Sequence, residues 1–283
     1  MPIAHIRGVN IIYKVIGASG PWVALSPGGR RDMNGVEGLA SSIADQGFRV
    51  LIHDRRNCGL SDICIEGEDS EYEIWADDLY ELLRQQNALP AYIGGSSSGC
   101  RLSVLFALRH PEAVKGLLLW RVTGGRLACE RLAHNYYQQY IDAAETGGMR
   151  AVCELDHFKE RCAANPSNLG YLVRLDPKKF IAVMQHWREY FVRGADLPII
   201  GASEADLHSI KVPAVVIPGN DRTHGTETGK TAARLIPNAE LHIIWPKDLD
   251  IELSPAEDWD VKNPEMAGYF VAMMKRVEAS AKA

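Results

Sequence analysis

Short apolar runs alternate with amphipathic segments over most of the chain. The apolar runs expected to form buried strands are WVALS (22–26), RVLIHD (49–54), AYIGG (91–95) and VKGLLLW (114–120). The amphipathic segments expected to form helices between them are 35–47, 75–87 and 100–111. Because helices between strands form parallel crossovers, we predict an α/β fold with a mostly parallel, doubly wound sheet. Residues 5–17 instead predict an antiparallel hairpin at the sheet edge.

The alternation of strands and helices stops after Trp120. The following region predicts helices only, and their expected ranges are 126–148, 149–165 and 177–194. The earlier pattern then resumes, with expected elements at 212–219, 228–237, 239–245 and 263–280. We therefore predict a core in two parts, 1–125 and 208–283, interrupted by a helical cap at 126–207.

Composition excludes several classes of function. The chain has 283 residues, a formal net charge of −5 and no stripe of Lys and Arg, which argues against nucleic acid as a partner. No apolar run is long enough to span a membrane, and the first residues lack a signal-peptide pattern, so we expect a cytoplasmic protein. The six cysteines are scattered without a Cys-x-x-Cys pair, which predicts reduced thiols. We expect no metal and no cofactor.

The strongest chemical signal is the segment YIGGSSSGCRL. A strand runs directly into a helix here, and Gly95-Ser96-Ser97-Ser98-Gly99 fits G-x-S-x-G in that context. The small residues allow a tight turn, and the central serine must tolerate a strained backbone to present its hydroxyl above the sheet. The alternative is an ordinary turn rich in serine and glycine.

The wider pattern resembles the α/β-hydrolase superfamily over nearly the whole chain. SPGG (26–29) stands where members often have His-Gly, and DRRNCGLSD (54–62) is similar to the family's D-x-R-G-x-G-x-S-D. By this resemblance Ser97 is the nucleophile, and the backbone N–H groups of Gly29 and Ser98 form the oxyanion hole. The segment after residues 212–219 resembles the acid loop of the family, which implies that Asp221 is the triad acid.

The catalytic histidine of the resemblance is missing. The family places it after the last strand, about 25 to 30 residues past the acid, but IIWPKDLD occupies that loop here. Asp250, or else Asp248, stands at the expected position. A serine hydroxyl needs a base, and histidine suits the task because its pKa lies near neutrality.

His224 is the candidate for a relocated base among the nine histidines. It follows Asp221 by three residues on the acid loop, so it would accept the proton of Ser97 while Asp250 or Asp221 orients it. Two alternatives remain open: His224 lines the pocket without acting as the base, or Asp250 or Asp248 accepts the proton directly through a pKa raised by burial.

These residues predict a serine hydrolase of a small ester, lactone or related carbonyl compound. Arg30, Arg31 and Arg121 are candidates for holding a substrate carboxylate, with surface solvation as the alternative. Two other functions stay open: a lyase or carbon–carbon bond-cleaving enzyme, and a non-enzymatic ligand-binding member. We expect a small-molecule substrate as partner. The apolar last helix leaves monomer and homodimer both possible.

Overall fold

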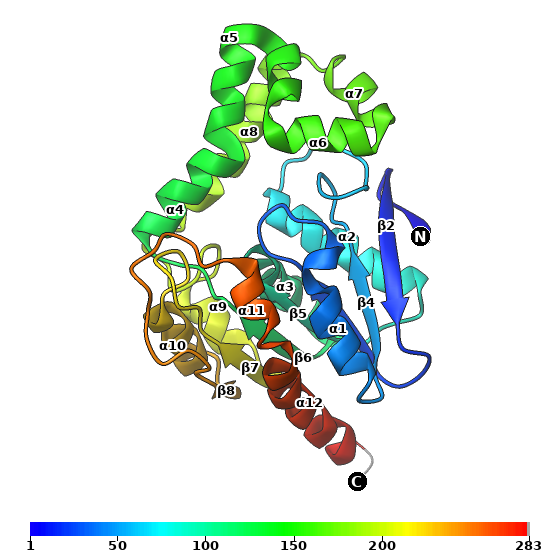
Figure 1. The fold of residues 1–283 in the computed structure, drawn as a ribbon, viewed down its shortest axis with the longest axis vertical. Coiled ribbons are helices and arrows are strands. Elements are labelled where there is room, and N and C mark those ends of the chain that lie inside the picture. Colours follow the sequence, from blue (N-terminus) through cyan, green and yellow to red (C-terminus); the bar gives the residue numbers. More distant parts are fainter. Residues whose placement is uncertain (282–283) are drawn as a thin grey trace.

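The computed structural model describes residues 1–281, and their strands form an eight-stranded sheet in the order β1-β2-β4-β3-β5-β6-β7-β8 (Figure 1). The strands are β1 (Ile3–Ile6), β2 (Val9–Ile16), β3 (Trp22–Ser26), β4 (Arg49–His53), β5 (Ala91–Ser96), β6 (Val114–Trp120), β7 (Ala214–Ile217) and β8 (Ala239–Leu241). β1 pairs antiparallel with β2, and β2 with β4, while the remaining neighbours are parallel. The mostly parallel, doubly wound sheet and its edge hairpin are confirmed.

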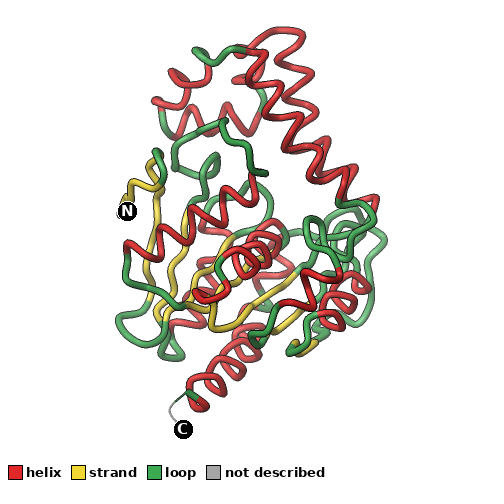
Figure 2. The backbone as a smooth tube through the Cα atoms, turned by 180° about the vertical axis from the view of Figure 1, so that it is seen from behind, coloured by secondary structure: helices red, strands yellow, loops and turns green. Residues whose placement is uncertain are grey.

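Helices cover both faces of the sheet, as Figure 2 shows from behind. Their core segments are η1 (Met33–Val36), α1 (Glu37–Ala44), α2 (Glu71–Gln85), α3 (Ser98–Arg109), η2 (Pro111–Ala113), α10 (Thr226–Leu235), α11 (Ala256–Asp260) and α12 (Asn263–Ser280). Successive side chains of β6 alternate between two cores: Leu117 and Leu119 face one, while Leu118 and Trp120 face the other. The first core lies under α2, α3 and α10, and the second under α1 and α12.

Local sequence explains where two elements begin and end. Helix α2 begins at Glu71, before the expected residue 75, because Ser70 and Glu73 cap each other's backbone N–H groups. Strand β8 ends at Leu241, although a strand was expected to continue to 245. Pro246 cannot donate a ladder hydrogen bond, and the chain leaves the sheet before reaching it.

A block of helices separates β6 from β7. It contains α4 (Arg126–Ala133), the π-helical turn η3 (His134–Gln138), α5 (Gln139–Glu154), α6 (Asp156–Ala164), α7 (Pro166–Leu172), α8 (Pro177–Arg193) and α9 (Glu204–Ser209). Most of the block stands beyond one end of the sheet, with α5, α6 and α7 at the top of Figure 1. The expected helix at 149–165 is instead divided at Leu155, whose extended backbone ends α5. Among residues 1–281, no helix has the length and apolar character needed to cross a membrane.

Candidate active site

Ser97 lies at the sharp turn between β5 and α3, at the carboxyl end of the sheet. Its φ and ψ are +52° and −107°, a backbone conformation that a side-chain-bearing residue rarely adopts. The two flanking glycines make the turn possible, because a Cβ on Gly95 would lie 2.4 Å from Gly99 C and one on Gly99 would lie 2.1 Å from Ser26 O. The residue types of the G-x-S-x-G segment thus follow from close backbone contacts at this turn.

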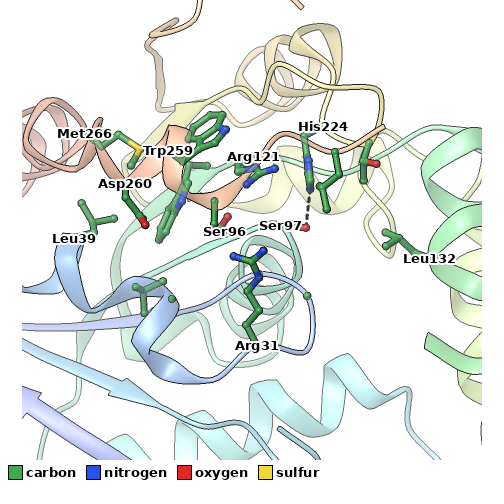
Figure 3. A pocket seen from close by; sticks show the side chains of 18 of the residues that line it. Arg31, Leu39, Ser96, Ser97, Arg121, Leu132, His224, Trp259, Asp260 and Met266 are labelled. Carbon is green, nitrogen blue, oxygen red and sulfur yellow. Dashed lines mark hydrogen bonds between the residues drawn. The ribbon is translucent and has the colours of Figure 1, made fainter. Parts of the chain in front are cut away.

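A chain of hydrogen bonds links Ser97 to the loop that follows β7. His224 Nε2 lies 2.8 Å from Ser97 Oγ, as the dashed line in Figure 3 marks. His224 Nδ1 lies 2.8 Å from Asp221 Oδ1. The backbone N–H groups of Thr223 and His224 also donate to Asp221 Oδ1, at 3.0 and 2.9 Å. A single tight turn therefore holds both the imidazole and the carboxylate that orients it.

The second oxygen of Asp221 is held from two other segments. Ser254 donates to Asp221 Oδ2 from both its backbone N–H, at 2.9 Å, and its hydroxyl, at 2.7 Å. Arg121 Nη2 donates to the same oxygen at 3.0 Å, and Trp259 Nε1 donates to Ser254 Oγ at 3.1 Å. The Asp221 side chain is fully buried, and these donors replace the water that an ionised carboxylate would otherwise bind.

Burial and charge set the protonation states of this pair. The pKa of His224 is lowered to about 4, chiefly by burial; the hydrogen bond with Asp221 opposes this shift, and the charge of Arg121 adds to it. Burial alone would raise the pKa of Asp221, but hydrogen bonds from His224 and Ser254 hold it well below its usual range. At neutral pH the imidazole is therefore neutral and able to accept a proton, beside an ionised carboxylate.

The two residues expected to form an oxyanion hole lie next to Ser97. Ser98 is the first residue of α3, so its backbone N–H lies at a helix N-terminus, where such groups lack intrahelical partners. Gly29 has a φ of +53°, and its carbonyl accepts a hydrogen bond from Arg55 Nη2 at 2.8 Å. A Cβ on neighbouring Gly28 would lie 3.3 Å from Ser97 Cβ, so this glycine loop packs against the serine.

The structure does not bring Asp250 or Asp248 to Ser97. The side chain of Asp250 is 88% exposed and pairs with Arg222, while Asp248 accepts hydrogen bonds from Thr226 at the start of α10. Asp221 holds the position beside His224 that the sequence left open between Asp221 and Asp250. The prediction that Asp250 orients the histidine is therefore wrong, because the loop after β8 turns its acids toward solvent.

The predicted carboxylate-binding arginines differ in their surroundings. Arg30 is buried and pairs with Glu71 at 2.7 Å, outside the cavity at Ser97, so its prediction as a substrate-binding residue is wrong. Arg121 does line the cavity, but its Nη2 is bound to Asp221 and Ser254. Arg31 also lines the cavity. The sequence alone could not show which of the two adjacent residues, Arg30 or Arg31, is buried and which faces the cavity.

A cavity of about 240 Å³ opens above Ser97, a size that suits a small substrate. One part is apolar, with Leu39, Trp259 and Met266, and another is lined by Leu132 and Tyr136 of the inserted helices.

Sequence reasoning missed two neighbours of the hydrogen-bond chain. Thr123, whose Oγ1 lies 3.3 Å from Ser97 Oγ, carried no sequence signal, and Ser254 lies within the very loop where the histidine was sought. Within residues 1–281, no three His, Cys, Asp or Glu side chains converge as a metal site would require.

Comparison with known proteins agrees with this architecture. The family model described as alpha/beta hydrolase fold matches residues 21–128. A thermophilic esterase from Thermogutta terrifontis has a similar structure, with a TM-score of 0.66 and 19% identity over 96% of this chain and 99% of that one. The chain therefore has the α/β-hydrolase fold, and residues 21–128 match the model of that family.

Other α/β-hydrolase relatives vary in their named activities. The enol-lactonase from Burkholderia xenovorans LB400 has a TM-score of 0.59 and 21% identity, over 98% of this chain and 100% of that one. The non-heme chloroperoxidase CPO-A1 of Kitasatospora aureofaciens is 26% identical over 91% of this chain and 95% of that protein. The uncharacterized hydrolase YraK of Bacillus subtilis is 36% identical, but the match spans only 39% of this chain and 40% of that protein. Together the relatives support a hydrolase.

Proposed function

We propose that this protein is a serine hydrolase that cleaves a small ester or lactone through an acyl-enzyme on Ser97. One observation carries the proposal: the unbroken hydrogen-bond chain from Ser97 Oγ through His224 to Asp221, at 2.8 Å for each step, beside a small cavity. Its members play the roles of nucleophile, base and orienting acid, which are defined by geometry and not by chain order. The similar structures named as an esterase and an enol-lactonase add support for the substrate class.

The reaction follows from the positions of these groups. Ser97 Oγ attacks the carbonyl carbon as its proton passes to His224 Nε2, and the carbonyl oxygen becomes an anion that accepts hydrogen bonds from the N–H groups of Gly29 and Ser98. The anion collapses, the bond to the alcohol oxygen breaks, and His224 gives its proton to that oxygen. A water molecule then attacks the ester of Ser97 by the same steps, which releases the acid and restores the hydroxyl.

The inserted helices act as a cap over this reaction in our proposal. Arg131 and Leu132 of α4, with Asn135 and Tyr136 of η3, line the same cavity as Ser97. A lid of this kind excludes water and shapes the part of the substrate that the core does not contact.

A fluorophosphonate probe tests the proposal because it reacts with activated serines. We expect wild-type protein to be labelled stoichiometrically, Ser97→Ala to give no labelling, and Ser42→Ala, a change on α1 outside the cavity, to be labelled like wild type. Absence of labelling in folded wild-type protein, checked by circular dichroism, would contradict the hydrolase and favour a ligand-binding member. Labelling without turnover of any ester or lactone, together with cleavage of a carbon–carbon bond, would favour the lyase alternative.

A further inference from the structure

Two guanidinium groups approach the nucleophile from opposite sides of the cavity. Figure 3 shows Arg31 pointing toward Ser96 and Ser97, with Arg121 on the far side of these serines. Arg121 uses Nη2 to bind Asp221 and Ser254, and its Nε has no hydrogen-bond partner among the described residues. Arg121 is therefore engaged by the acid of the hydrogen-bond chain, whereas Arg31 faces the serine from the other side.

Arg31 differs from the other arginines around the cavity. Arg131 pairs with Glu252 and Arg121 with Asp221, whereas no carboxylate of residues 1–281 forms an ion pair with the exposed side chain of Arg31. The cavity acid Asp260 lies on the side of Leu39 and Met266, away from Ser97 in Figure 3. Arg31 thus presents an unneutralised planar cation with donors suited to a carboxylate.

The position of Arg31 limits where such a carboxylate can lie. It follows the glycine loop by two residues, so the same segment presents both the Gly29 N–H and the guanidinium. An anion held by Arg31 would therefore sit close to the carbonyl that Ser97 attacks. The small volume of the cavity also excludes a long chain between the two groups.

We propose that Arg31 binds a carboxylate of the substrate, so that the preferred substrates are short acyl esters or lactones carrying a second, free carboxylate near the scissile carbonyl. This inference rests on the proposed serine hydrolase. Attraction across the cavity mouth brings the anionic substrate in, and the charge-assisted hydrogen bonds hold its carbonyl over Ser97.

Two esters of one acid provide the test. Monomethyl succinate carries the free carboxylate, while dimethyl succinate has the same carbon chain without it, and a pH-stat at pH 7.5 follows hydrolysis of both. We expect kcat/KM of the wild-type protein to be about 10- to 100-fold higher for the monoester. Arg31→Gln should remove this preference by lowering kcat/KM for the monoester alone, and Arg31→Lys should restore part of it because the charge remains. Raised salt should weaken the preference in wild type.

The control is Arg222→Gln, which removes an exposed arginine that pairs with Asp250 outside the main cavity. It should retain the full preference for the monoester. Equal rates for both esters in wild type, or a preference unchanged in Arg31→Gln, would overturn the role of Arg31 while leaving the hydrolase intact. A different result would contradict the proposed serine hydrolase itself: Ser97→Ala would then hydrolyse both esters as fast as wild type.

Discussion

The loops that follow β7 and β8 contribute very unequally to the candidate site. The loop after β7 buries Asp221, Thr223 and His224, while the loop after β8 exposes Asp248 and Asp250. The second loop reaches the candidate site only at its end, where Ser254 donates twice to Asp221. In the proposed mechanism the base comes from the first loop, and the second loop supports the acid.

The compactness of the first loop explains how it holds both groups. Asp221 and His224 are three residues apart and joined by a backbone hydrogen bond as well as by their side chains. Gly219 allows the turn to close, because a Cβ there would lie 2.2 Å from His224 Cβ. A local turn of this kind fixes the imidazole without a long second loop. A histidine on the loop after β7, in place of one on the loop after β8, therefore needs no change in the sheet.

Substituting the histidine of each loop is the strongest test of the unequal contributions of the loops after β7 and β8. We expect His224→Ala to lower kcat by about 10⁴- to 10⁶-fold, because Ser97 loses its proton acceptor. His242→Ala changes the histidine at the start of the second loop, which stacks on Tyr269, and should keep kcat within about twofold. Initial rates with dimethyl succinate measure both. Activity retained in His224→Ala would show that another base serves Ser97.

Asp221→Asn should have the next largest effect, with a loss of about 10²- to 10⁴-fold in kcat, because the amide cannot stabilise the imidazolium that forms. The change also leaves Arg121 buried without its carboxylate, which should lower the free energy of unfolding by about 3–5 kcal/mol. Urea unfolding followed by fluorescence measures the second effect. Asp248→Asn, in the exposed loop, is the matched control, and a loss of kcat there as large as in Asp221→Asn would contradict the assignment.

The pH dependence of kcat/KM reports the pKa of His224, which depends on its burial in the loop after β7. A base works only while its imidazole is neutral, so activity falls as the pH decreases through the pKa of His224 in the free enzyme. Because burial lowers that pKa to about 4, we expect kcat/KM for dimethyl succinate to be constant from pH 8 to about 5.5 and half-maximal near pH 4. A midpoint near 6.5 would indicate a solvated histidine in place of the buried one.

Much of this arrangement followed from local sequence. The alternation of apolar and amphipathic runs predicted the sheet, and the glycines around Ser97 predicted its turn, because both depend on neighbouring residues. The proximity of Asp221 and His224 in sequence also allowed one turn to be considered for both. Pairings between distant segments were less accessible to the sequence.

Arg30 and Arg31 illustrate why pairings between distant segments are hard to predict from the sequence. They are adjacent and chemically identical, but Arg30 turns inward to pair with Glu71 on α2, while Arg31 remains at the cavity. Asp250 fits the expected spacing, yet the loop after β8 pairs it with Arg222. Ser254 was not singled out in the sequence, because its partner, Asp221, is 33 positions away.

Ser254→Ala examines the support that the second loop provides. Losing one hydroxyl donor to Asp221, at 2.7 Å, should lower kcat about five- to tenfold and the free energy of unfolding by about 1 kcal/mol, because the backbone N–H still donates. KM should stay unchanged, since Ser254 positions the acid and does not touch the substrate. Ser254→Thr restores the hydroxyl and should recover most of kcat. An equal loss in both variants would indicate a packing defect.

Asp250→Asn should produce the smallest effect, although this residue occupies the position at which the sequence resemblance led us to expect the catalytic histidine. Its side chain is 88% exposed and its partner Arg222 is 53% exposed, and exposed ion pairs contribute only about 0–1 kcal/mol. We therefore expect kcat and KM within about twofold of wild type, measured beside Asp221→Asn under the same conditions. A large loss of kcat with normal unfolding would require the loop after β8 to close over Ser97 during turnover. The two loops would then act together, and the division between base and support would no longer hold.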